Sequence, residues 1–133
     1  MEMSPSYGYT RSLPGIDYND AVPKAIDSLA TEGFGVLTQI EVKATLKKKL
    51  GTDSRNYLIL SPCNPSLALE ALTVDPAIGL LLPCNVVVTE DDDGNAMVVA
   101  IRPSAMFTIV NNSVIELVAA EVDAMIKRTL EAL

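Results

Sequence analysis

The two cysteines of this 133-residue chain stand in the same tripeptide, Pro-Cys-Asn, at 62–64 and again at 83–85. A cysteine thiolate can act as a nucleophile, a redox centre or a ligand for a soft metal. The chain contains no histidine, so it lacks the commonest general base and metal ligand. Cys63 and Cys84 are therefore its strongest candidates for chemistry.

Cys63 directly precedes Asn64 and Pro65, a typical N-cap and first-turn pair that predicts the start of a helix. The positive end of that helix dipole would favour a thiolate at Cys63. Cys63 could then serve as a nucleophilic, redox-active or sulfur-carrying thiol. The alternative is that both cysteines are small apolar side chains that fill the fold, Cys84 at the start of an apolar strand.

Whether the two thiols act together depends on how the chain returns between them. A disulfide needs Cα atoms about 4.4 to 6.8 Å apart. A simple parallel crossover would place Cys63 and Cys84 at opposite edges of the sheet, whereas the extra segment 75–82 could return the chain to the same end. Two thiolates fall short of a closed zinc site, so we predict no metal, and the residues indicate no particular cofactor.

The asparagines of the two tripeptides are candidate ligand-binding residues. Asn64 and Asn85 could place two amides beside two thiols in one pocket. Their alternative roles are structural, because Asn64 can cap a helix and Asn85 can satisfy backbone groups where a strand begins.

A basic cluster offers a second candidate for binding. Lys43 and Lys47 are four residues apart on one helical face, where with Tyr57 they could hold a carboxylate or phosphate. A solvated helix face explains the same cluster. The cluster also contains Lys48, Lys49 and Arg55.

Bulk composition excludes several classes of protein. The net charge of −7 disfavours general binding to nucleic acids or anionic membranes. The longest apolar stretch, 77–88, is interrupted by Pro83 and is too short to cross a bilayer. Since the N-terminus also lacks the pattern of a secretory signal, we expect a cytoplasmic protein with reduced thiols.

The elements that must position these residues read as one α+β domain spanning 1–133. Alternating or β-branched apolar runs predict five strands, and apolar residues at helical spacing predict four helices. We expect the order β-α-β-α-β-α-β-β-α, with a mixed sheet covered by helices. The strands are expected at 7–13, 35–42, 56–61, 84–89 and 96–102, and the helices at 18–32, 43–50, 64–74 and 113–133.

Two of these helices carry finer expectations. In the helix over 43–50, Ala44, Leu46 and Leu50 should face inward. In the last helix, Ser113 and Glu116 should form a capping box. That helix is apolar over more than one stripe, which suggests either a subunit contact or a well-covered sheet.

Three long segments resemble the family catalogued as domain of unknown function 302. They are GFGVLTQIEVKATLKKKLG (33–51), CNPSLALEAL (63–72) and IGLLLPCNVVV (78–88). The resemblance implies a compact β-α-β(4)-α-like domain that tends to form homodimers, and it implies no activity.

Three functions remain open from the sequence. The first is a homodimeric module that binds a small molecule, which could be anionic. The second is a thiol-based redox or sulfur-transfer protein using Cys63 and Cys84. The third is a structural or interaction subunit without a pocket.

Overall fold

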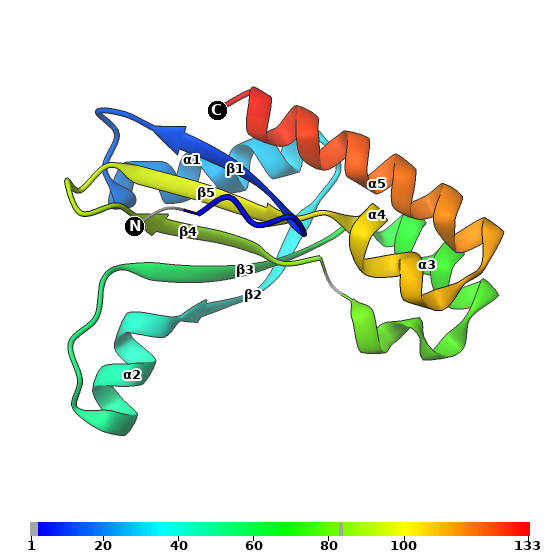
Figure 1. Ribbon diagram of the computed structural model, residues 1–133, viewed down its shortest axis with the longest axis horizontal. Helices are drawn as coiled ribbons and strands as arrows, with labels where there is room; N and C mark the ends of the chain where they lie inside the picture. Colours follow the sequence, from blue (N-terminus) through cyan, green and yellow to red (C-terminus); the bar gives the residue numbers. More distant parts are fainter. Residues whose placement is uncertain (1–2, 83) are drawn as a thin grey trace.

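The computed structural model describes residues 3–82 and 84–133, which form one five-stranded sheet and the helices packed against it (Figure 1). The strands lie in the order β1-β5-β4-β3-β2, and every neighbouring pair that the described residues form is antiparallel. The strands are β1 (Gly8–Leu13), β2 (Gly35–Glu41), β3 (Tyr57–Cys63), β4 (Val86–Glu90) and β5 (Ala96–Ile101). The α+β class and the five strands are confirmed.

The helices follow the predicted order, with two short additions after β5. The α-helices are α1 (Tyr18–Thr31), α2 (Val42–Leu50), α3 (Pro65–Val74), α4 (Pro103–Met106) and α5 (Ser113–Glu131). The 3₁₀ helices are η1 (Pro76–Leu81) and η2 (Phe107–Val110). The sequence predicts an extra connecting segment at 75–82, where η1 forms, but it does not predict α4 or η2.

The prediction of a mixed sheet is wrong, and the reason lies between β3 and β4. A strand, a helix and a second strand usually form a right-handed crossover between parallel strands. Here η1 follows α3 and returns the chain to the end of the sheet that it left, so that Leu60 of β3 pairs with Val86 of β4 in antiparallel register. The two strands are therefore direct antiparallel neighbours.

Helices cover one face of the sheet and leave the other face open (Figure 1). α1 contacts β4 and β5, while α5 contacts β1 and α1. Since side chains alternate along a strand, every second residue enters the core under these helices. The buried strand residues of this core include Leu58, Leu60, Val86, Val88, Val98 and Ala100. Their neighbours Tyr57, Ile59, Val87 and Val99 are only half-buried.

The prediction that α2 presents an inward face is wrong. None of its nine residues is buried, and Leu50 is 71% exposed. β2 and α2 extend away from the helical layers, so α2 has no core to cover (Figure 1). β2 and α2 together are called the β2–α2 arm below.

The predicted capping box at the start of α5 is also wrong, by one residue. Asn112 is the N-cap, and its Oδ1 accepts hydrogen bonds from the backbone N–H groups of Val114 (2.9 Å) and Ile115 (3.1 Å). Ser113 is therefore the first helical residue, and Glu116 lies beyond the position from which it could close the box.

Replacing the true cap should destabilise the fold. Asn112→Ala leaves two N–H groups of α5 without their acceptor and should lower the free energy of unfolding by about 1 kcal/mol. Urea unfolding followed by circular dichroism measures this difference. Ser113→Ala is the matched control and should change stability by less than about 0.5 kcal/mol. A larger loss for Ser113→Ala than for Asn112→Ala would contradict the assignment.

Candidate functional site

The antiparallel pairing of β3 and β4 brings Cys63 and Cys84 to the same end of the sheet. Cys63 is the last residue of β3, and Cys84 lies two residues before β4. The two segments remain adjacent beyond Leu60 and Val86, the last paired residues of β3 and β4 at this end. There the Ser61 hydroxyl donates a hydrogen bond to Oδ1 of Asn85 (3.2 Å). The returning segment 75–82 thus produces the adjacency that the sequence leaves open.

Both thiols line one apolar cavity of about 260 Å³, here called the thiol cavity. α3, η1 and α5 contribute walls to it. Phe34 contributes to the wall from the turn after α1. In that turn Gly33 adopts a φ of 85°, which residues other than glycine rarely adopt. The remaining lining residues are Leu37, Pro62, Asn64, Leu67, Ala68, Ala71, Leu72, Gly79, Leu82, Phe107, Val118 and Val122.

The two thiols differ in their surroundings. Both are free, Cys63 is half-buried, and Cys84 is only 7% exposed. Burial, with a smaller contribution from nearby Cys63, raises the pKa of Cys84 from 9.0 to about 12. Cys84 is therefore a protonated thiol at neutral pH, whereas Cys63 stands nearer to solvent.

Asn64 caps α3 and also lies in the wall of the thiol cavity. Its Oδ1 accepts a hydrogen bond from the N–H of Leu67 (3.3 Å), so it caps α3 as predicted.

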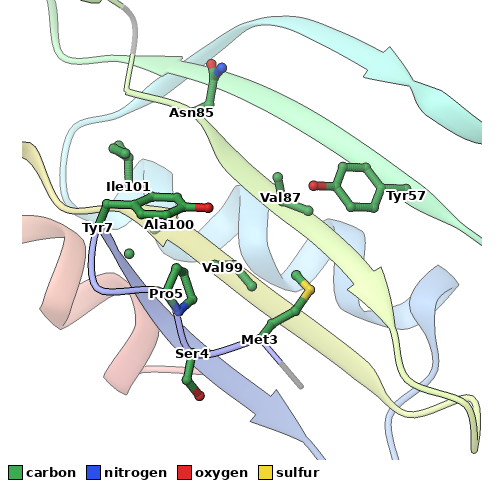
Figure 2. Close-up of a pocket in the computed structure, with 11 residues that line it drawn as sticks. Met3, Ser4, Pro5, Tyr7, Tyr57, Asn85, Val87, Val99, Ala100 and Ile101 are labelled. Atoms are coloured by element: carbon green, nitrogen blue, oxygen red, sulfur yellow. The ribbon is translucent and has the colours of Figure 1, made fainter. Parts of the chain in front are cut away.

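Tyr57 and Asn85 lie elsewhere, in a cavity of about 610 Å³ on the open face of the sheet (Figure 2). We call it the open-face cavity. The hydroxyl groups of Tyr7 and Tyr57 point toward one another across Val87. None of the described residues that line this cavity is charged. The other lining residues are Met3, Ser4, Pro5, Gly8, Val99, Ala100 and Ile101.

Hydrogen bonds hold the N-terminal segment 3–7 against the open face. The Thr10 hydroxyl donates to the carbonyl of Met3 (2.6 Å), and Nη1 of Arg102 donates to the carbonyl of Ser6 (3.1 Å). Gly8 permits the close approach, because an added Cβ would lie 3.1 Å from both the Ala100 carbonyl oxygen and Cγ of Pro5. Segment 3–7 therefore forms a fixed wall of the cavity.

Lys43 and Lys47 line neither cavity. Both lie on the exposed surface of α2, and Nζ of Lys47 forms a solvent-exposed ion pair with Asp53 (3.2 Å). The sequence grouped Asn64 with Asn85 and the two lysines with Tyr57, whereas the structure places Tyr57 with Asn85, Asn64 in the thiol cavity and the lysines on α2. Among residues 3–82 and 84–133, no group of three or more histidine, cysteine, aspartate or glutamate residues could hold a metal ion. No helix of the described chain is long and apolar enough to cross a membrane.

One partly buried polar cluster, centred on Asp123, could not be found by sequence reasoning. The carboxylate of Asp123 on α5 accepts hydrogen bonds from the hydroxyl groups of Tyr9 and Ser104. Arg102 and Lys127 place their cationic groups 5.2 and 5.1 Å from the centre of the Tyr9 ring. These contacts join β1 and the start of α4 to α5. The five residues are scattered between positions 9 and 127, so no local sequence motif predicts that they meet.

Comparisons with known proteins place this geometry in a family. A family model described as "Domain of unknown function DUF302" matches residues 9–133. A solved structure described as "Crystal structure of uncharacterized conserved protein DUF302 from Bacillus stearothermophilus" is similar, with a TM-score of 0.88 and 29% sequence identity. That similarity covers 96% of this chain and 98% of the other. Among curated proteins, no significant match is found.

The buried thiol of Cys84 should make the protein less stable in alkali. A pKa raised from 9.0 to about 12 means that the folded state keeps this proton longer than the unfolded state. The stabilising effect is complete below about pH 9 and is lost as the pH rises toward 12, with a slope of at most about 1.4 kcal/mol per pH unit. Urea unfolding at several pH values measures the slope.

Cys84→Ala is the control for this alkaline prediction. The variant should lose stability more slowly than the original protein between pH 9 and 10, where Tyr18 adds the same pH dependence to both proteins. Burial, with contributions from Glu41 and Glu90, raises the pKa of Tyr18 from 10.0 to about 12. Equal slopes in both proteins would show that Cys84 is not protected from ionisation.

Proposed function

The chain belongs to the DUF302 family, and we propose that it is a cytoplasmic, homodimeric module that binds a small molecule in the open-face cavity. The observation that carries this proposal is the cavity itself. Its volume of about 610 Å³ lies within the usual range of small-molecule sites. Strand side chains form its floor and segment 3–7 forms a wall, so much of the site exists before a ligand arrives.

The lining of the cavity favours an uncharged ligand that is mostly apolar. Val87, Val99 and Ile101 offer aliphatic contact, while Tyr7 and Tyr57 offer hydroxyl groups that can donate or accept hydrogen bonds. Asn85 lies at one end of the cavity (Figure 2). The sequence suggested an anionic ligand because of Lys43 and Lys47. Both lysines lie on the β2–α2 arm and not in the open-face cavity, so they do not support an anion in that cavity.

The β2–α2 arm supports the homodimer. It exposes three apolar side chains on two consecutive elements: Leu37 (68%), Ile40 (47%) and Leu50 (71%). The same arm carries four lysines on α2, whereas the whole chain has a net charge of −7. A basic, partly apolar arm on an acidic body favours contact with a second copy of the chain. α5 is a weaker candidate, because most of its apolar residues are buried within the protomer.

A pair of matched fragments tests the ligand class. Benzamide and benzoate have the same size, but only benzoate is charged. We expect benzamide to perturb tyrosine resonances of the cavity in NMR titrations and to bind more tightly than benzoate. Tyr57→Phe, which removes one hydrogen-bonding group, should weaken benzamide binding about fivefold, equivalent to about 1 kcal/mol.

Lys47→Ala is the control for the fragment test, because Lys47 lies outside the cavity and its loss should leave benzamide binding unchanged. Tighter binding of benzoate, lost in Lys43→Ala and Lys47→Ala, would favour an anion site on the arm instead. Binding of neither fragment, together with an intact dimer, would favour a purely structural subunit.

Analytical ultracentrifugation tests the dimer and its surface. The original protein should sediment as a dimer, and Leu50→Glu should raise the dimer dissociation constant about tenfold or more by placing a charge in the apolar contact. Leu117→Glu is the matched control, because Leu117 on α5 is 72% exposed and receives the same change. A monomeric original protein, or dissociation by Leu117→Glu alone, would contradict the proposed surface.

A further inference from the structure

We propose that Cys63 and Cys84 form a dithiol pair that reduces a small apolar organic disulfide bound in the thiol cavity. The site is separate from the open-face cavity and does not depend on the proposed ligand there. Its basis is the meeting of two free thiols, distant in sequence, in one apolar cavity of about 260 Å³.

The strand pairing makes a bond between the two sulfurs feasible. Leu60 pairs with Val86 and Ser61 contacts Asn85, so the same register would set Cys84 opposite Pro62, one residue from Cys63. Both cysteines line the same cavity. Because adjacent strands lie about 4.8 Å apart and rise about 3.4 Å per residue, an offset of one residue puts two Cα atoms about 6 Å apart, within the range that a disulfide spans. Cys84 lies outside β4, which leaves its backbone free of the ladder bonds that would resist a small adjustment.

The two thiols are unequal in the way that a two-step exchange requires. Half-buried Cys63 can reach a bound disulfide first. Buried Cys84 is protonated near neutral pH and is thereby protected from direct attack on reagents in solution. It would react only when a mixed disulfide forms beside it.

The lining of the thiol cavity determines which disulfide can bind there. The described side chains that line it are mainly aliphatic or aromatic and include no charged group. The space suits short alkyl substituents and excludes a bulky, charged disulfide such as oxidised glutathione, whose carboxylates would lose their hydration without a partner.

The reaction balances in two exchange steps. The Cys63 thiolate attacks one sulfur of R–S–S–R, which forms a Cys63–S–S–R bond and releases RS⁻, and this thiolate takes up the proton that Cys63 lost. Cys84 then loses its proton and attacks Sγ of Cys63, which breaks the mixed disulfide and releases the second RSH. The two cysteines are oxidised to one disulfide, and R–S–S–R is reduced to two thiols.

Intact-mass spectrometry with diethyl disulfide tests the proposal. The original protein should lose the mass of two hydrogen atoms and release ethanethiol, and dithiothreitol should restore its mass. Cys84→Ala should stop at a single ethylthio adduct on Cys63, with complete loss of the internal disulfide. Cys63→Ala should not react while folded. Oxidised glutathione, as the charged comparison, should react far more slowly with the original protein.

Alkylation of the unmodified protein supplies a measurement that needs no variant. With iodoacetamide near neutral pH, peptide mapping should show Cys63 modified first. Cys84 should react on the order of a thousandfold more slowly than an ordinary thiol, as its raised pKa requires. Equal rates at both cysteines, adducts on both without an internal disulfide, or no reaction before unfolding would each overturn the proposal.

Discussion

The antiparallel pairing of β3 with β4 is the constraint on which the rest of the structure depends. α3 and η1 occupy the space between the two strands in sequence, and together they return the chain to the end of the sheet that β3 leaves. This return brings Cys63 beside Cys84, places α3 against α5, and closes the walls of the thiol cavity. It also aligns Tyr57 and Val87 on the opposite face, where the floor of the open-face cavity forms.

The helices divide the molecule into two chemically different sides. Under α1 and α5, alternate strand residues form the core, and the partly buried polar cluster around Asp123 joins α5 to β1 and α4. On the other face the same strands carry half-buried aliphatic and tyrosine side chains, and segment 3–7 supplies the only cover that the described residues provide. A ligand can therefore meet the sheet directly on one side, while α1 and α5 block it on the other.

Features set by neighbouring residues could be predicted from the sequence. The β-branched apolar runs at 84–89 and 96–102 were sufficient to predict β4 and β5, and Asn64 with Pro65 was sufficient for the start of α3. The cap of α5 was missed by one residue because Asn112 and Ser113 are both good caps, and only the backbone conformation distinguishes them.

Features that depend on distant contacts could not be predicted. The spacing of Leu46 and Leu50 indicates an amphipathic helix, but it does not say whether a core exists for that helix to cover. Likewise, Tyr7 lies at the open-face cavity in a segment that Arg102, far along the chain, holds through the carbonyl groups of Ser6 and Tyr7.

The pairing of β1 with β5 has a consequence for the order of folding. Gly8 pairs with Ile101 and Leu13 with Ala96, so β1 can join the sheet only after the β4–β5 hairpin has left the ribosome. Closing so long a stretch of chain costs entropy that local contacts do not repay. During synthesis, the first strand of the chain must therefore wait for the last strand, and the open-face cavity cannot acquire its N-terminal wall before β5 is available.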